Sequence, residues 1–275
     1  MEPTPEIIAY YERFAEETRL ATGPGRLEFE RTKDILGRLL PPPPARIIDI
    51  GGAAGVYSAW LSERGYDMHL VDASPRLVEE ARRHNRNLTR PIASLTVADA
   101  RSLPQPDGFA DAALLMGPLY HLQTDSDRAL ALTEAARVLR PAALLIVAAI
   151  SRYASALDGL VRQRSQDPAF VRMRNRDLRD GHHLNESGHP EYFTTAYFHQ
   201  PEDLRRELED GGFSDVHVLG VEGPGWLLGD FEKRWADPAS RRDILDVARA
   251  LETAPSIVGA SAHLIGIGRR RREGD

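Results

Sequence analysis

The chain has 275 residues, with 41 acidic side chains against 35 Lys and Arg, so its formal net charge is −6. This length allows one large α/β domain or two small ones, and the acidic balance argues against a general nucleic-acid-binding protein, which needs a basic face. The sequence contains no cysteine, which excludes disulfides, a thiolate nucleophile and a cysteine-rich metal site.

The N-terminal part predicts helices. Residues 5–20 and 26–40 each place apolar side chains at helical spacing. The acidic, proline-rich start of the chain is unlike a signal peptide, and its longest apolar run, residues 142–150, is too short to cross a bilayer. We therefore expect a cytoplasmic protein that makes no membrane contact.

The stretch over residues 45–57 reads Ala-Arg-Ile-Ile-Asp-Ile-Gly-Gly-Ala-Ala-Gly-Val-Tyr. Its isoleucines predict a buried parallel strand, and a helical pattern follows the glycines. A strand, a glycine-rich turn and a helix N-terminus let the backbone approach a ligand closely. Asp49 places a carboxylate at this turn, which would repel a pyrophosphate and suits a cationic ligand.

Strands and helices then alternate, which predicts a parallel sheet. The expected strands are residues 69–72, 95–97, 110–116 and 142–150. Ser74 and Thr124 are the expected caps of the helices that follow them, and Pro141 is expected to end the second of these helices.

Residues 151–200 interrupt the alternation, because they contain no clear strand. Such a segment in a regular fold predicts a lid or a substrate-binding insertion. A helix from Pro201, a strand over residues 216–221, helix over residues 237–251 and a strand over residues 262–267 are expected next, followed by a solvated basic tail, Arg269 to Arg272. We expect one structural domain in four parts: a helical cover (1–40), a cofactor-binding core (41–150), a lid (151–200) and the rest of the sheet (201–275).

Three acids stand at or near the ends of predicted strands: Asp49, Asp72 and Asp99. Ligands of open parallel sheets bind outside the carboxyl ends of the strands, so the three acids are expected to face one crevice. Each alone could be a helix N-cap, but three in register with a glycine turn favour a cofactor site.

In this order, residues 45–150 resemble the class I S-adenosylmethionine-dependent methyltransferases. Motif I of that family, usually Asp-x-Gly-x-Gly-x-Gly, stands here as Asp49, Gly51, Ala53 and Gly55, with one methyl group in place of the middle glycine. The resemblance implies a Rossmann-like α/β fold with a doubly wound, mostly parallel seven-stranded sheet, N-terminal helices and a helical lid. It also implies S-adenosyl-L-methionine as the cofactor.

The resemblance implies roles for individual residues. Asp72 would bind the ribose hydroxyls and Asp99 the adenine amino group, while the end of the fourth strand would line the reacting methyl. Tyr11 and Arg31 are expected to close over the cofactor, because Arg suits its carboxylate. The expected cofactor-binding residues are Tyr11, Arg31, Asp49, Gly51, Gly52, Ala53, Gly55, Asp72, Ala73, Asp99, Ala100, Met116 and Gly117.

Methyl transfer is an in-line displacement in which positioning and exclusion of water dominate. His121, just beyond the fourth strand, is the candidate base, with a structural histidine as the alternative. The expected substrate-binding residues are Tyr120, Tyr192, Phe193, Tyr197, His199 and Trp226. No metal is expected, because His182, His183 and His189 are irregularly spaced and no carboxylate cluster accompanies them.

The acceptor is expected to be a small molecule with an O, N or C nucleophile. Cytosine C5 methylation needs a cysteine, and Gly117-Pro118-Leu119-Tyr120 stands where amino-methylating DNA enzymes carry Asn/Asp-Pro-Pro-Tyr/Phe. Two alternatives stay open. A nicotinamide-dependent oxidoreductase shares the strand, turn and ribose acid, although Asp49 and the missing G-x-G-x-x-G count against it. A non-catalytic regulatory protein could keep the cofactor fold.

Overall fold

The structure is a computed structural model that describes residues 16–189, 191–272 and 274. Most of the helix expected over residues 5–20 therefore lies outside the described residues. The strands are β1 (Arg46–Ile50), β2 (Asp67–Asp72), β3 (Ser94–Val97), β4 (Ala110–Leu115), β5 (Leu139–Ser151), β6 (His182–His183), β7 (Ala196–His199), β8 (Phe213–Gly220) and β9 (His263–Arg270).

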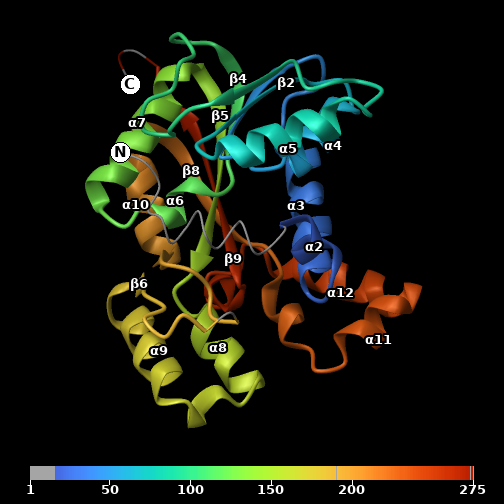
Figure 1. Ribbon diagram of the computed structural model, residues 1–275, viewed down its shortest axis with the longest axis vertical. Coiled ribbons are helices and arrows are strands. Elements are labelled where there is room, and N and C mark those ends of the chain that lie inside the picture. Colours follow the sequence, from blue (N-terminus) through green and yellow to red (C-terminus); the bar gives the residue numbers. More distant parts are fainter. Residues whose placement is uncertain (1–15, 190, 273, 275) are drawn as a thin grey trace.

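One mixed sheet forms the centre of the molecule (Figure 1). Its seven main strands follow the order β3-β2-β1-β4-β5-β9-β8, in which β9 is antiparallel to both of its neighbours and the other pairs are parallel. The short strands β7 and β6 extend the sheet from the end of β5. The predicted Rossmann-like, mostly parallel α/β fold is confirmed.

Helices cover both faces of the sheet (Figure 1). They are α2 (Glu16–Ala21), α3 (Gly25–Leu39), α4 (Val56–Ser62), α5 (Pro75–Asn85), α6 (Pro118–His121), α7 (Asp125–Val138), α8 (Ala154–Val161), α9 (Pro168–Asp180), α10 (Pro201–Asp210), α11 (Phe231–Ala236) and α12 (Pro238–Leu251). As predicted, the Ser74 hydroxyl accepts a hydrogen bond from the Leu77 amide at 3.3 Å and that of Thr124 from the Asp127 amide at 3.1 Å, which caps α5 and α7.

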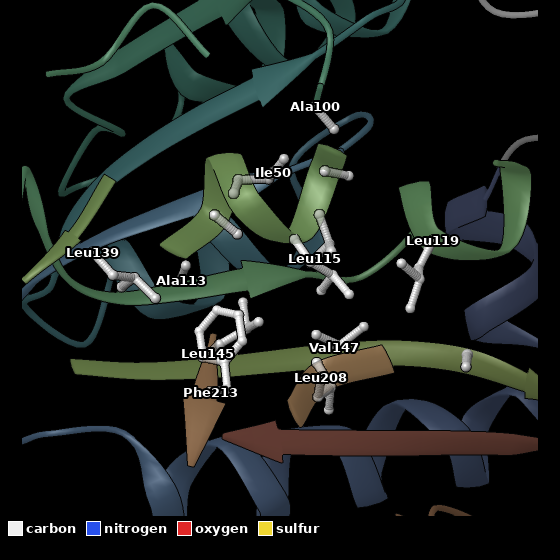
Figure 2. Close-up of a cluster of buried hydrophobic side chains, with 14 of the residues drawn as sticks. Ile50, Ala100, Ala113, Leu115, Leu119, Leu139, Leu145, Val147, Leu208 and Phe213 are labelled. Carbon is white, nitrogen blue, oxygen red and sulfur yellow. The ribbon is translucent and has the colours of Figure 1, made fainter. Parts of the chain in front are cut away.

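Alternation along the strands divides the core into two layers. Ile48 and Ile50 pack with α7 and α10 on one face (Figure 2), whereas Ile47 packs with α3, α4 and α5 on the other. Beyond the carboxyl end of β5, helices α8 and α9 project in one group and α11 and α12 in another (Figure 1). No helix among the described residues is long and apolar enough to span a membrane.

Two predictions about strands were wrong. The insertion does contain strands, since β7 pairs with the end of β5 and β6 pairs with β7. The basic tail begins later than predicted, because Arg269 and Arg270 belong to β9 and donate to carbonyl oxygens at the start of β5. Guanidinium groups that satisfy these carbonyls extend the strand beyond its apolar residues.

A third prediction was partly wrong. Helix α7 ends at Val138, before Pro141, but Pro141 lies inside β5. The pairing register of β4 and β5 shifts beside it, and Ala142 adopts a left-handed φ of +65°. A bulge of this kind admits a proline that a regular ladder would exclude.

Replacing a core side chain should test this layered packing. Leu145 lies fully buried in β5 (Figure 2), so Leu145→Ala should lower the free energy of unfolding by about 2–5 kcal/mol because it removes contacts and leaves a cavity. The matched control is Leu160→Ala on α8, where the side chain is 72% exposed and the change should stay within about 0.5 kcal/mol. Urea unfolding measures both, and equal effects would contradict the assigned core.

Candidate functional site

A tight turn joins β1 to α4 at the carboxyl edge of the sheet. Gly51, Ala53 and Gly55 all have left-handed φ angles, of +74°, +48° and +87°. A Cβ on Gly51 would lie 2.4 Å from the ring of Pro118, which follows β4. The turn therefore requires small residues, and Ala53 occupies a conformation that glycine adopts more easily, which is where motif I usually has glycine.

The Asp49 carboxylate lies beneath this turn and is only 1% exposed. Its Oδ2 accepts a hydrogen bond from the Ser58 hydroxyl at 2.6 Å, while Oδ1 has no hydrogen-bond partner among the described residues. A Cβ on Gly52 would approach Oδ2 to 2.8 Å, so the turn packs directly on the carboxylate. Burial raises the pKa of Asp49 to about 6, against the Ser58 hydrogen bond and with help from the Asp72 charge.

Asp72 connects the turn to the second strand. Its carboxylate accepts hydrogen bonds from the backbone amides of Ala53, at 2.9 Å, and Ser74, at 2.8 Å. Burial raises the pKa of Asp72, and these two hydrogen bonds oppose the rise. The half-buried Ala73 follows directly, so the end of β2 and the glycine turn form one hydrogen-bonded unit.

Asp99 is paired with Arg101, a residue that the sequence analysis missed. The Arg101 guanidinium donates to both Asp99 oxygens, at 2.9 and 2.6 Å, and to Asp127 on α7 at 2.7 Å. Burial alone would raise the pKa of Asp99, but the hydrogen bonds from Arg101 outweigh it and the pKa lies below its usual range. An Arg two residues after the acid was the feature of the sequence that could have predicted this pair. Ala100, between Asp99 and Arg101, is buried and packs against the core (Figure 2).

The chain after β4 brings three predicted substrate-side residues together. Met116 and Gly117 lead into α6, where the Tyr120 and His121 rings lie 4.6 Å apart. Phe193, from the insertion, lies 6.3 Å from Tyr120 and stacks on His121 at 6.0 Å. An aromatic wall, formed by Tyr120, His121 and Phe193, thus stands beside the end of β4.

Two other predicted substrate residues lie elsewhere, which corrects the prediction for them. The Tyr197 ring lies 3.7 Å from the Arg128 guanidinium, and His199 is fully buried with Nε2 3.2 Å from a Glu207 oxygen. Burial lowers the pKa of His199. Both side chains leave β7 on the face opposite Phe198, because successive side chains of a strand alternate, so they form a structural network with α7 and α10.

The side chains of Tyr192 and Trp226 each donate a hydrogen bond away from the aromatic wall. The Tyr192 hydroxyl donates to Asp167 within the insertion, and its buried ring packs on Phe170 at 5.2 Å. The Trp226 indole N–H donates to the Ala260 carbonyl at 2.9 Å from the short 3₁₀ helix η2 (Gly223–Leu227). Neither contact joins these residues to the aromatic wall.

The prediction that Arg31 closes over the cofactor is also corrected. It is 1% exposed, its guanidinium pairs with Asp34 and Glu252, and its Nε donates to the Val221 carbonyl at 3.2 Å. These partners engage the guanidinium inside the α3–α12 contact, where a cofactor carboxylate cannot reach it. Tyr11 lies outside the described residues.

A groove of about 370 Å³ runs beside the turn, between α2, α3 and the start of α4. Its lining is mostly apolar: Leu20, Ala21, Phe29, Ala54, Gly55, Val56, Ala59 and His84. The volume is that of a small-molecule site, and Gly55 places the groove directly against the glycine turn.

One group of potential metal ligands occurs among the described residues: Glu28, Glu222 and His263. Glu28 is paired with Arg19, and the His263 ring lies 2.5 Å from a Glu222 oxygen through Nδ1. Burial would lower the pKa of His263, but the two carboxylates outweigh it and raise the pKa to about 9. The printed contacts join these three side chains and Arg19 in one ion-pair network.

Residues 47–142 match a family model described as "Methyltransferase domain". The demethylmenaquinone methyltransferase of Beutenbergia cavernae is 33% identical over 48% of this chain and 50% of that protein. The glycine/sarcosine N-methyltransferase of Parasynechococcus marenigrum is 33% identical over 50% of this chain and 49% of that protein. This chain therefore spans about half the length of these curated relatives.

The fold matches a SAM-dependent methyltransferase structure from Methanosarcina mazei with a TM-score of 0.59. The match covers 86% of this chain and 97% of that one, at 17% sequence identity. At this identity the likeness concerns the fold alone.

The buried Asp49 should make stability depend on pH. Its pKa of about 6 in the folded protein exceeds the ordinary value, so the folded state binds the proton more tightly and stability falls as the pH rises from about 4 to about 6. Asp49→Asn cannot ionise. The free energy of unfolding of this variant minus that of the wild type should therefore rise by about 3 kcal/mol as the pH rises from about 4 to about 6.

Urea unfolding between about pH 4 and pH 7.5 measures this difference. The control is Asp243→Asn, at an exposed position of α12, where the difference from the wild type should hardly change. A pH-independent difference for Asp49→Asn would contradict the buried, raised-pKa carboxylate.

Proposed function

We propose that this chain, whose residues 47–142 belong to the class I S-adenosylmethionine-dependent methyltransferase family, transfers a methyl group to an O, N or C atom of a small molecule. The match to the methyltransferase family over these residues confirms the resemblance seen in the sequence, and that family uses S-adenosylmethionine. The observation that carries the proposal is the glycine turn over the buried Asp49, in which the Ala53 amide donates to Asp72 at the end of the neighbouring strand. Asp99 follows β3, which pairs with β2.

The proposed cofactor crevice runs along the carboxyl edge of β1, β2, β3 and β4. Asp72 is the proposed ribose ligand and Asp99, held by Arg101, the proposed adenine ligand. Tyr11 remains part of the proposal, whereas Arg31 is withdrawn. The remaining proposed contacts are Asp49, Gly51, Gly52, Ala53, Gly55, Ala73, Ala100, Met116 and Gly117.

When bound, S-adenosylmethionine supplies a methyl group on a positively charged sulfur. The Asp49 charge favours a cation near the turn, and the turn's small residues let the backbone approach it. The aromatic wall of Tyr120, His121 and Phe193 is proposed to orient a flat acceptor and to exclude water from the reacting atoms. Trp226 and Tyr192 are proposed to contact more distant parts of the acceptor.

Two other functions make different predictions. An oxidoreductase would place a dinucleotide pyrophosphate on the turn, where the buried Asp49 charge opposes it. A regulatory protein would bind the cofactor without turnover. Calorimetry with S-adenosylmethionine and NAD(P) tests the first, and a screen of metabolite extracts for labelled methyl transfer tests the second.

The ribose assignment predicts a large loss of affinity in Asp72→Ala. Two hydrogen bonds to a charged acceptor are removed, each contributing about 1.5–3 kcal/mol, so the Kd for S-adenosylmethionine should rise by at least roughly a hundredfold. Asp72 also holds the Ser74 amide, so Ser74→Ala, which removes only the helix cap, is the control and should bind nearly normally. Unchanged affinity in Asp72→Ala would refute the assignment.

His121 is proposed to act on the acceptor, as its base or as the group that orients it. His121→Ala should then lower kcat by about 10²–10⁴-fold if the residue is the base, while the Kd for the cofactor stays nearly the same. A lower Tm with normal specific activity in the folded fraction would show a structural histidine. Loss of cofactor binding would place His121 on the other side of the methyl group.

Residues 1–40 and 151–200 are proposed to form a mobile cover over the core of residues 41–150, with residues 201–275 completing the sheet. Cofactor binding should slow amide hydrogen exchange in both segments, because closure protects backbone that otherwise opens locally. Peptides from α10 serve as the control and should not change. Equal exchange of both segments with and without cofactor would count against a cover.

A further inference from the structure

The insertion contains a buried pair of ionisable side chains that the proposed cofactor crevice does not use. Asp177 on α9 is 0% exposed and His183 on β6 is 1% exposed. An Asp177 oxygen, Oδ2, lies 2.9 Å from Nδ1 of His183. The imidazole stacks on the Phe198 ring, with centroids 4.5 Å apart and planes 13° from parallel.

Each member of this pair has one buried atom without a hydrogen-bond partner among the described residues. These atoms are Oδ1 of Asp177 and Nε2 of His183. Buried polar atoms are nearly always paired, because leaving one unpaired costs about 1–3 kcal/mol. Changing the protonation state of the imidazole does not give Nε2 a partner, because the atom carries either an unpaired lone pair or an unpaired N–H. The Nε2 atom is therefore suited to a polar group from outside the protein.

His183 faces the aromatic wall. It pairs with Ala196 across the β6–β7 ladder, and directly opposed residues project from the same face. Ala196 and Phe198 pack in one cluster with Tyr120 and Phe193. The His183 ring lies 6.3 Å from Phe193, which stacks on His121 at 6.0 Å, so the pair stands one aromatic ring away from His121.

We propose that Asp177 and His183 form the dyad that takes the proton of the methyl acceptor; this inference rests on the proposed function. Asp177 accepts the Nδ1–H of His183, which leaves Nε2 unprotonated and basic, and its negative charge balances the imidazolium that forms. Phe193 contacts both His183 and His121, so the proposed proton transfer requires its side chain to change rotamer and admit the acceptor to Nε2.

The proton balance limits the acceptor to a hydroxyl or an amine. With a hydroxyl acceptor, Nε2 takes the O–H proton as an oxygen lone pair forms the bond to the methyl carbon. An amine forms this bond with the lone pair that it already has, and Nε2 takes the N–H proton of the resulting ammonium. The electrons of the carbon–sulfur bond remain on sulfur, which becomes neutral. His121 then orients the acceptor, and His183 returns its proton to solvent when the cover opens.

Other charged groups surround the dyad from several elements. On its own elements, Arg176 pairs with Glu186, and Asp180 contacts Arg179 and His182. From the end of β5, Arg152 approaches Gly181 and is paired with Asp203. Removing Asp177 takes the carboxylate from Nδ1 of His183.

The first test compares His183→Gln with His182→Gln, the neighbour that projects from the opposite face against Tyr197. Labelled methyl transfer from S-adenosylmethionine to catechol and to tyramine is measured against pH. His183→Gln should lower kcat by about 10²–10⁴-fold and abolish the fall in rate at acidic pH, with an unchanged Kd for S-adenosylhomocysteine. His182→Gln should behave as the wild type, and His121→Ala should keep the acidic limb of the profile.

Asp177→Asn should keep part of the activity and move the acidic limb to lower pH, which a purely structural role would not do. Equal kcat values in His183→Gln and His182→Gln, or a lower Tm with normal activity in the folded fraction, would overturn the dyad.

A second measurement does not depend on the acceptor. Long-range ¹⁵N NMR of the histidines, with S-adenosylhomocysteine present, should show His183 with the proton on Nδ1 in the wild type. A wild-type His183 with the proton on Nε2 alone would overturn the dyad. If the wild type binds no S-adenosylhomocysteine, the proposed function fails, and the NMR result still decides the dyad.

Discussion

A carboxylate buried under a glycine turn is the constraint on which the cofactor edge depends. Asp49 can lie there only because Gly52 has no Cβ to meet its oxygen and because the turn adopts left-handed backbone angles. Asp72 then holds the amide of Ala53 from the neighbouring strand. The burial that raises the Asp49 pKa also makes its negative charge strongly felt, since a buried charge is poorly screened.

Arginine pairs fix the surroundings of this turn. Arg101 clamps Asp99 to the N-terminal turn of α7, and Arg31 ties α3 to α12 through Glu252. Charge-assisted hydrogen bonds of this kind add geometric specificity as well as energy. On the other side, Phe193 brings the insertion against α6, so two segments far apart in the sequence meet beside β4.

Local patterns in the sequence predicted the sheet and its edge well, because β-branched runs, caps and glycine turns act over a few residues. Side-chain partners from distant segments could not be predicted. The sequence around Arg31 suggests a free cation on a helix, whereas in the structure Arg31 is paired with Glu252, 221 residues away. Tyr197 and His199 read as active-site residues until the strand they form sends them to the opposite face. Pro141 suggests the end of a helix, whereas in the structure a bulge between β4 and β5 lets it lie inside a strand.

The central claim is that the Asp49 charge selects a positively charged ligand at the turn. S-adenosylmethionine and S-adenosylhomocysteine differ in the charge on sulfur, so the ratio of their Kd values isolates this effect. Calorimetry of both ligands from about pH 5 to pH 8 should show S-adenosylmethionine gaining affinity relative to S-adenosylhomocysteine as Asp49 ionises near its pKa of about 6. A ratio that stays constant across this range, or binding of neither ligand, would contradict the account.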